Sequence, residues 1–272
     1  MRSAPPDRFS RWTAAVLEVP RVWLDRDLRV RMTDHGYAVL NGDLEAAIEG
    51  LEEIERSARS KAVTGWANAG VAFALLAASR WDDAERAAAR HPDRTSQPLL
   101  ELTLELRRGH LDPRFAGALA DCTFAVAAAG AARAVIATDR LDDVLAQATG
   151  SPPDKQALAL LALQMGLHVN HDHAAAIRVG ELVQGRAAAW DISPYWVAID
   201  QAAVGDHAAA LSWLNRAADA GCSAVAHLDM DPRFDATRTM PAFAEVRSRM
   251  LANPSHPADT HHGGLLWAGR RR

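Results

Sequence analysis

The chain of 272 residues contains little cysteine and little tyrosine, with two residues of each. Cys122 and Cys222 lie far apart and in no C-x-x-C context. A disulfide framework is therefore not expected, and two free thiols in a reducing compartment are the natural interpretation. We expect a cytoplasmic protein.

The sequence also lacks an excess of positive charge and long apolar runs. Its net charge is −4, so it provides no global positive field for nucleic acid or an anionic membrane surface. Apolar runs such as 71–78 and 157–163 are much shorter than the roughly 20 residues that span a bilayer. The N-terminus has a charge and two prolines where a secretory signal places its apolar core. Nucleic-acid and membrane partners are not expected.

A repeated pentapeptide shows how the chain is organised. "DHAAA" occurs at 172–176 and again 34 residues later, at 206–210. Similar stretches each place Gly, Asn, Asp or His between two segments with apolar residues at helical spacing. They begin at Asn41, Ala78, Arg108, Thr138, Asn170 and Val204. No segment alternates as a half-buried strand would, so the sequence predicts pairs of helices joined by short turns.

Small residues recur at fixed places in these pairs. Short helix pairs cannot bury their own apolar faces, so neighbouring pairs are expected to stack into a solenoid. Closely crossing helices need small side chains at their contacts. One alanine position lies just after the turn, and a second lies in the preceding helix. The residues concerned are Ala47, Ala84, Ala176 and Ala210 after the turn, and Ala72, Ala132 and Ala198 before it.

A two-helix unit of 34 residues with Gly-Asp at the turn and alanine soon after resembles the tetratricopeptide repeat. The last unit is the most similar, with Gly205-Asp206 at the turn and then Ala210, Leu214 and Ala217. The third unit departs from the pattern, with Arg114 in place of the alanine. The resemblance implies an all-α fold: a right-handed α-α superhelix, a TPR-like solenoid of about six helix pairs, over residues 25–221.

Residues 227–250 resemble the closing segment that follows such arrays in bacterial regulatory proteins, where the pattern is D-P-x-F-D-x-L-R-x-x-P-x-F, and a C-terminal cap is expected over 222–252. Thr237 takes the place of the usual leucine. The resemblance implies a C-terminal cap in which two phenylalanines close the stack. The matching residues are Asp231, Pro232, Phe234, Asp235, Arg238, Pro241 and Phe243.

The two ends of the chain differ in composition from the repeats. Residues 1–24 form an N-terminal extension that contains a candidate capping helix. Residues 253–272 are rich in Pro, Gly and His, and a disordered tail is expected there.

The resemblance implies a non-catalytic protein-interaction scaffold or regulatory adaptor. In such arrays the first helix of each pair lines a concave groove that binds a segment of a partner protein. The corresponding residues here are mainly apolar and aromatic, so an apolar or amphipathic partner segment is expected, and no cofactor or metal. They are Trp66, Phe73, Leu99, Val126, Arg133, Leu161, Met165, His168, Tyr195 and Ile199.

Two alternatives stay open. "HVNHDH" at 168–173 partly resembles the H-x-H-x-D-H zinc motif of metallo-β-lactamase-like hydrolases, although Asn170 stands where the second histidine belongs. It would make the chain a metal-dependent enzyme on a helical solenoid. The repeat favours a turn instead, because Asp172-His173 recurs as Asp206-His207.

The second alternative is a regulator whose apolar groove binds a small molecule. We identify no catalytic residue, since no common nucleotide-binding, hydrolase or zinc-protease motif occurs.

Overall fold

A computed structural model describes residues 43–58, 61–90, 98–122, 125–184, 193–220, 222, 228–229 and 231–252. Every regular element in these ranges is a helix, which confirms the expected all-α class. No described helix has the length and apolar character needed to cross a bilayer. The extension at 1–24, the expected first helix before Asn41 and the tail at 253–272 lie outside the described residues.

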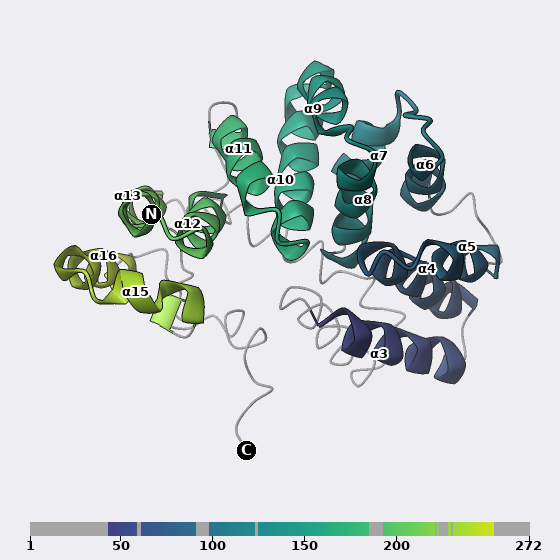
Figure 1. The fold of residues 1–272 in the computed structure, drawn as a ribbon, viewed down its shortest axis with the longest axis horizontal. Coiled ribbons are helices and arrows are strands. Elements are labelled where there is room, and N and C mark those ends of the chain that lie inside the picture. Colours follow the sequence, from purple (N-terminus) through teal and green to yellow (C-terminus); the bar gives the residue numbers. More distant parts are fainter. Residues whose placement is uncertain are drawn as a thin grey trace, which may run out of the picture. The chain divides into compact units, whose positions relative to one another are not determined.

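The described residues form two compact units, which we call the N-terminal unit (43–172) and the C-terminal unit (173–252). Each consists of consecutive helices (Figure 1). The N-terminal unit contains α3 (Leu44–Ser57), α4 (Lys61–Ala77), α5 (Trp81–Ala89), α6 (Pro98–Arg107), α7 (Phe115–Ala120), α8 (Ala125–Ala137), α9 (Leu141–Gly150) and α10 (Pro153–Val169). The C-terminal unit contains α11 (His173–Gln184), α12 (Ser193–Ala203), α13 (His207–Asp219), the short 3-10 helix η2 (Pro232–Phe234), α15 (Asp235–Arg238) and α16 (Pro241–Leu251).

Five of the six turns predicted from the sequence lie within the described residues, and these five share one backbone geometry; the turn at Asn41 lies outside them. At each turn one residue has a positive φ, its N–H donates to the carbonyl three residues back, and the next N–H donates to the carbonyl five residues back. This is the Schellman arrangement, which satisfies the last carbonyls of a helix. At Gly205 the two distances are 3.1 Å to Ala202 O and, from Asp206 N, 2.9 Å to Gln201 O. The positive-φ residues are Ser79, Gly109, Asp139, His171 and Gly205.

These five turns belong to the second to sixth of the six aligned stretches, and we call them the second to sixth joints. They follow the predicted register: each positive-φ residue is the second residue of its aligned stretch. Asp43 and Asp206, at the same place in two stretches, cap the helices that follow. Their Oδ1 atoms accept hydrogen bonds from Ala46 N at 3.2 Å and Ala209 N at 2.9 Å. All seven repeated alanines have an exposed fraction of 0%. The helix-pair prediction is confirmed at these positions.

The N-terminal unit contains a row of closely packed helices, α4, α8 and α10. Gly130 of α8 lies against Phe73 of α4, where an added Cβ would be 2.6 Å from the Phe73 carbonyl oxygen. Gly166 of α10 lies against Ala128 of α8, and a Cβ there would be 2.2 Å from the Ala128 carbonyl oxygen. Backbones approach this closely only where glycine leaves room.

The third helix pair, α6 and α7, departs from regular stacking. Helix α4 packs along α8 and makes only marginal contact with α6, which lies against α8 and α7 (Figure 1). Regular stacking would place α6 between α4 and α8. The departure occurs in the unit whose sequence also departs from the repeat, with Arg114 at the alanine position.

The closing segment packs against α12 and α13 in the C-terminal unit. Phe234 and Phe243 are buried, with exposed fractions of 0% and 5%. Asp231 Oδ1 accepts a hydrogen bond from Arg233 N at 3.0 Å, which starts η2. Arg238 donates to the carbonyl oxygens of Leu228 and Asp231 at 2.8 and 3.1 Å. The order of charged and aromatic residues in this segment thus specifies one compact turn and its buried anchors.

Candidate functional site

The ten candidate groove residues fall into two classes. Trp66 and Arg133 are partly exposed. The other eight are buried: Phe73, Leu99, Val126, Leu161, Met165, His168, Tyr195 and Ile199. The reason is visible in α8 and in the second half of α10, which are apolar and buried around nearly their whole circumference. Most of the candidate groove positions therefore contribute to the helical core.

Trp66 and Arg133 come from neighbouring helices, α4 and α8. The Arg133 Nε donates to Ser79 Oγ at 2.7 Å, which ties α8 to the α4–α5 joint. Asn170 makes the matching link on the other side of α8, since its Nδ2 donates to Ala129 O at 2.8 Å. The side chain of Arg133 is thus positioned by the repeat itself while part of it faces solvent.

Tyr195 of α12 lies in the core of the C-terminal unit. Its ring centroid is 6.0 Å from that of Phe234, and 3% of the residue is exposed. Its hydroxyl has no hydrogen-bond partner among the described residues. Burial raises the pKa of Tyr195 well above its ordinary value, and the charge of Asp231 adds to the shift.

We expect Tyr195→Phe to raise the free energy of unfolding by about 1 kcal/mol at neutral pH, because it removes a buried hydroxyl without a described partner. The pKa of Tyr195 is raised in the folded state, so ionisation of this group lowers the free energy of unfolding. This pH-dependent part of the free energy is fully present below about pH 10 and is lost as the pH rises through the folded-state pKa. The variant should therefore resist alkaline unfolding better than the parent. Urea unfolding at a series of pH values measures both effects, and a destabilised Tyr195→Phe would show that the hydroxyl is bonded.

The histidines of the stretch at 168–173 occupy different environments. His168 is buried in the last turn of α10, and His171 is the positive-φ residue of the joint. His173 begins α11, and its Nδ1 lies 2.8 Å from Oδ1 of Asp200, a fully buried carboxylate of α12. Sequence reasoning missed Asp200; the available signal is an acidic residue in a mainly apolar helix.

The second copy of "DHAAA" uses its histidine in the same way. His207 begins α13, and its Nδ1 lies 3.2 Å from Thr237 Oγ1 of α15. Each imidazole thus links the second helix of a pair to a helix that follows. Thr237, which replaces the leucine of the closing pattern, is fully buried and is this partner. At both places the repeated histidine thus begins the helix after a joint and contacts a residue of a later helix.

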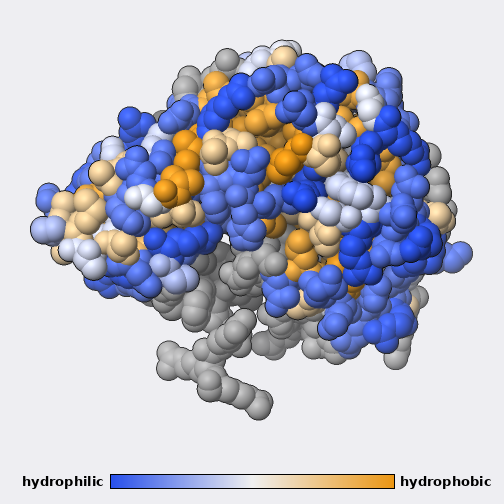
Figure 2. All heavy atoms as spheres, in the orientation of Figure 1, coloured by the Kyte–Doolittle hydropathy of each residue, from blue (hydrophilic) through white to orange (hydrophobic). Residues whose placement is uncertain are grey.

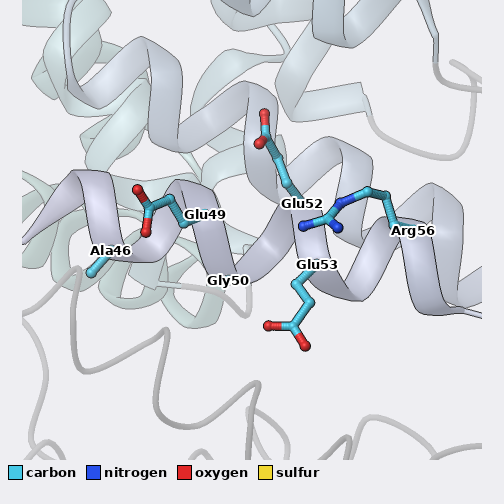
Figure 3. Close-up of a pocket in the computed structure, with 6 residues that line it drawn as sticks. All are labelled: Ala46, Glu49, Gly50, Glu52, Glu53 and Arg56. Carbon is cyan, nitrogen blue, oxygen red and sulfur yellow. The ribbon is translucent and has the colours of Figure 1, made fainter.

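The described residues that line a hollow along α3 all belong to that helix (Figure 3). The Arg56 guanidinium is turned back toward Glu52 and Glu53, and Glu49 points away from them. On the face seen in Figure 2, hydrophilic residues predominate and hydrophobic residues gather in small groups between them. The described residues of neither feature enclose a site for a small molecule.

One group of potential metal ligands lies within the N-terminal unit. The ligand atoms of Glu105, His110 and Asp112 all lie within 4.8 Å of one another. Hydrogen bonds from the Arg114 side chain, and then from its backbone N–H, lower the pKa of Asp112 to about 2. Sequence reasoning missed this group. The available signals were the histidine in the third joint and the arginine at the alanine position.

Comparison with protein-family models, with curated proteins and with solved structures found no match to this chain.

Proposed function

We propose that this chain is a non-catalytic scaffold, an array of TPR-like helix pairs in a right-handed superhelix that binds a segment of another protein. The observation that supports it is the recurrence of one joint geometry along the chain, followed by a closing segment with buried phenylalanines. Stacked helix pairs provide an extended, preformed surface, so a partner segment binds without ordering the scaffold.

The binding surface that we propose is centred on the two partly exposed groove residues, Trp66 and Arg133. Tryptophan and arginine are among the residue types most often responsible for binding energy at protein interfaces. The buried candidates, such as Phe73 and Tyr195, act by holding α4, α8 and α12 in place. An amphipathic segment suits this pair, with an apolar side chain for the indole and an acceptor for the guanidinium.

The experiment is retention of partner proteins from native extract on the untagged full chain, followed by affinity measurement for the protein that is retained. We expect Trp66→Ala and Arg133→Gln each to weaken its binding by at least about 1 kcal/mol. Replacing a buried candidate such as Phe73 would confound binding with folding, so it is not used.

Val204→Ser is the matched control, because Val204 is 52% exposed and outside the candidate groove. Circular dichroism must show that all three variants keep the helical fold. Affinity that is equal in the parent and both groove variants would refute the proposed surface. Absence of any protein partner, together with a metal whose binding requires His173, would instead favour the enzyme alternative.

A further inference from the structure

The third joint differs from its neighbours in the residue that follows the positive-φ position. In the second and fourth joints this residue is an arginine that forms an ion pair with an aspartate three residues later. The two pairs are Arg80–Asp83 at 2.9 Å and Arg140–Asp143 at 2.7 Å. The third joint has His110 at this place and Pro113 three residues later. In the third joint the aspartate that pairs with the arginine of the other two joints is therefore replaced by a proline.

The imidazole instead lies beside two other carboxylates. His110, Glu105 of α6 and Asp112 each offer a ligand atom, and these atoms lie within 4.8 Å of one another. One nitrogen and two carboxylate oxygens are a donor set suited to zinc and similar first-row dications, whereas calcium and magnesium prefer oxygen alone. Three protein ligands leave room for water in the fourth position of a tetrahedral zinc site.

The backbone around these ligands is held in place. Gly109 has a φ of 92°, and the His110 N–H donates to the Glu105 carbonyl at 3.0 Å. The Asp112 carbonyl oxygen accepts hydrogen bonds from Phe115 N at 3.0 Å and from Gln147 Nε2 of α9 at 3.2 Å. The cluster is thus built on a fixed joint, and a metal ion would need only side-chain adjustment to bring the ligands closer.

Arg114 is the competing cation. Its Nε and Nη2 donate to the two Asp112 carboxylate oxygens at 2.9 and 2.8 Å. The charges of Glu105 and Glu101 also act on this guanidinium. Three carboxylates, those of Asp112, Glu105 and Glu101, thus act on one arginine. Arg114 is 77% exposed in its side chain, which lets it move aside or share Asp112 with a metal.

We propose that Glu105, His110 and Asp112 form a zinc-binding site at the third joint, with Arg114 as the cation that zinc must displace or share. The site lies in the helix pair that departs from regular stacking. It is independent of the proposed scaffold function, because neither Trp66 nor Arg133 takes part in it.

The test uses the full chain without a histidine tag, stripped of metal and titrated with zinc chloride against a chromogenic chelator. We expect Glu105→Gln and His110→Asn each to weaken one zinc site by about 10-fold or more, since loss of even an outer partner of a metal ligand costs about 10- to 100-fold. Arg114→Gln should strengthen the same site. Zinc should also raise the melting temperature of the parent but not of the first two variants.

Glu85→Gln and His171→Asn are the controls. Glu85 is an exposed carboxylate paired with Arg108, and His171 is an exposed histidine of another joint. Both should bind zinc as the parent does. The proposal is overturned if the parent binds no zinc, or if Glu105→Gln and His110→Asn keep its stoichiometry and affinity. Should His110→Asn fail to fold, the Glu105→Gln and Arg114→Gln results still decide.

Discussion

Replacing Gly166 by alanine is expected to lower the free energy of unfolding of the N-terminal unit by about 3 kcal/mol or more. The added Cβ would lie 2.2 Å from the Ala128 carbonyl oxygen and 2.7 Å from the Ala132 Cβ. The first of these atoms is backbone, so relief requires α8 and α10 to move apart. Overpacking within a core typically costs about 1–3 kcal/mol, and a clash with backbone belongs at or above the top of that range.

Gly117→Ala is the control for this prediction, because an added Cβ at this helical glycine of α7 meets nothing within 4 Å. Alanine favours a helix over glycine by about 1 kcal/mol, so this variant should be unchanged or slightly stabilised. Urea unfolding followed by circular dichroism measures both variants. If Gly166→Ala is as stable as the parent, the close approach of α8 and α10 is wrong.

Phe234→Ala is expected to destabilise the C-terminal unit by about 3–5 kcal/mol, the usual cost of truncating a buried phenylalanine. Phe234 has an exposed fraction of 0% and contacts the Tyr195 ring, so the truncation opens a cavity between the closing segment and α12. Hydrogen–deuterium exchange resolved by mass spectrometry should show lost protection in residues 193–252.

Leu251→Ala provides the comparison in the same segment. Leu251 ends α16 and is 48% exposed, so its truncation should change stability by no more than about 0.5 kcal/mol. Equal exchange in Phe234→Ala and Leu251→Ala would mean that the phenylalanine does not anchor the closing segment.

Much of the local structure could be predicted because its causes are local. A joint is specified within about six residues, by hydrogen bonds that reach three and five residues back along the chain. The sequence marks such a joint directly. Gly205 tolerates the positive φ, and Asp206 caps the helix that follows. The register of the joints and the burial of the repeated alanines follow from the same pattern.

The candidate groove could not be placed in the same way. Successive residues on a helix differ by about 100° in direction, and helices that are apolar all round give no signal for which side faces solvent. Helix α8 is such a case, where Val126 is buried and Arg133, seven residues later, is partly exposed. The two residues lie on nearly the same face of the helix, so the packing of neighbouring helices decides how much of each is exposed.

The sequence by itself determined that the described chain consists of helix pairs, because turn chemistry and helical periodicity act over a few residues. The tertiary structure alone decided that α4 packs directly on α8, that His173 meets Asp200, and that Glu105, His110 and Asp112 converge. The reason is that these contacts depend on how helices approach one another. At Gly130 and Gly166 the close approach of the helices depends on the absence of a Cβ atom. A single glycine in a helix does not show in the sequence which helix packs against it.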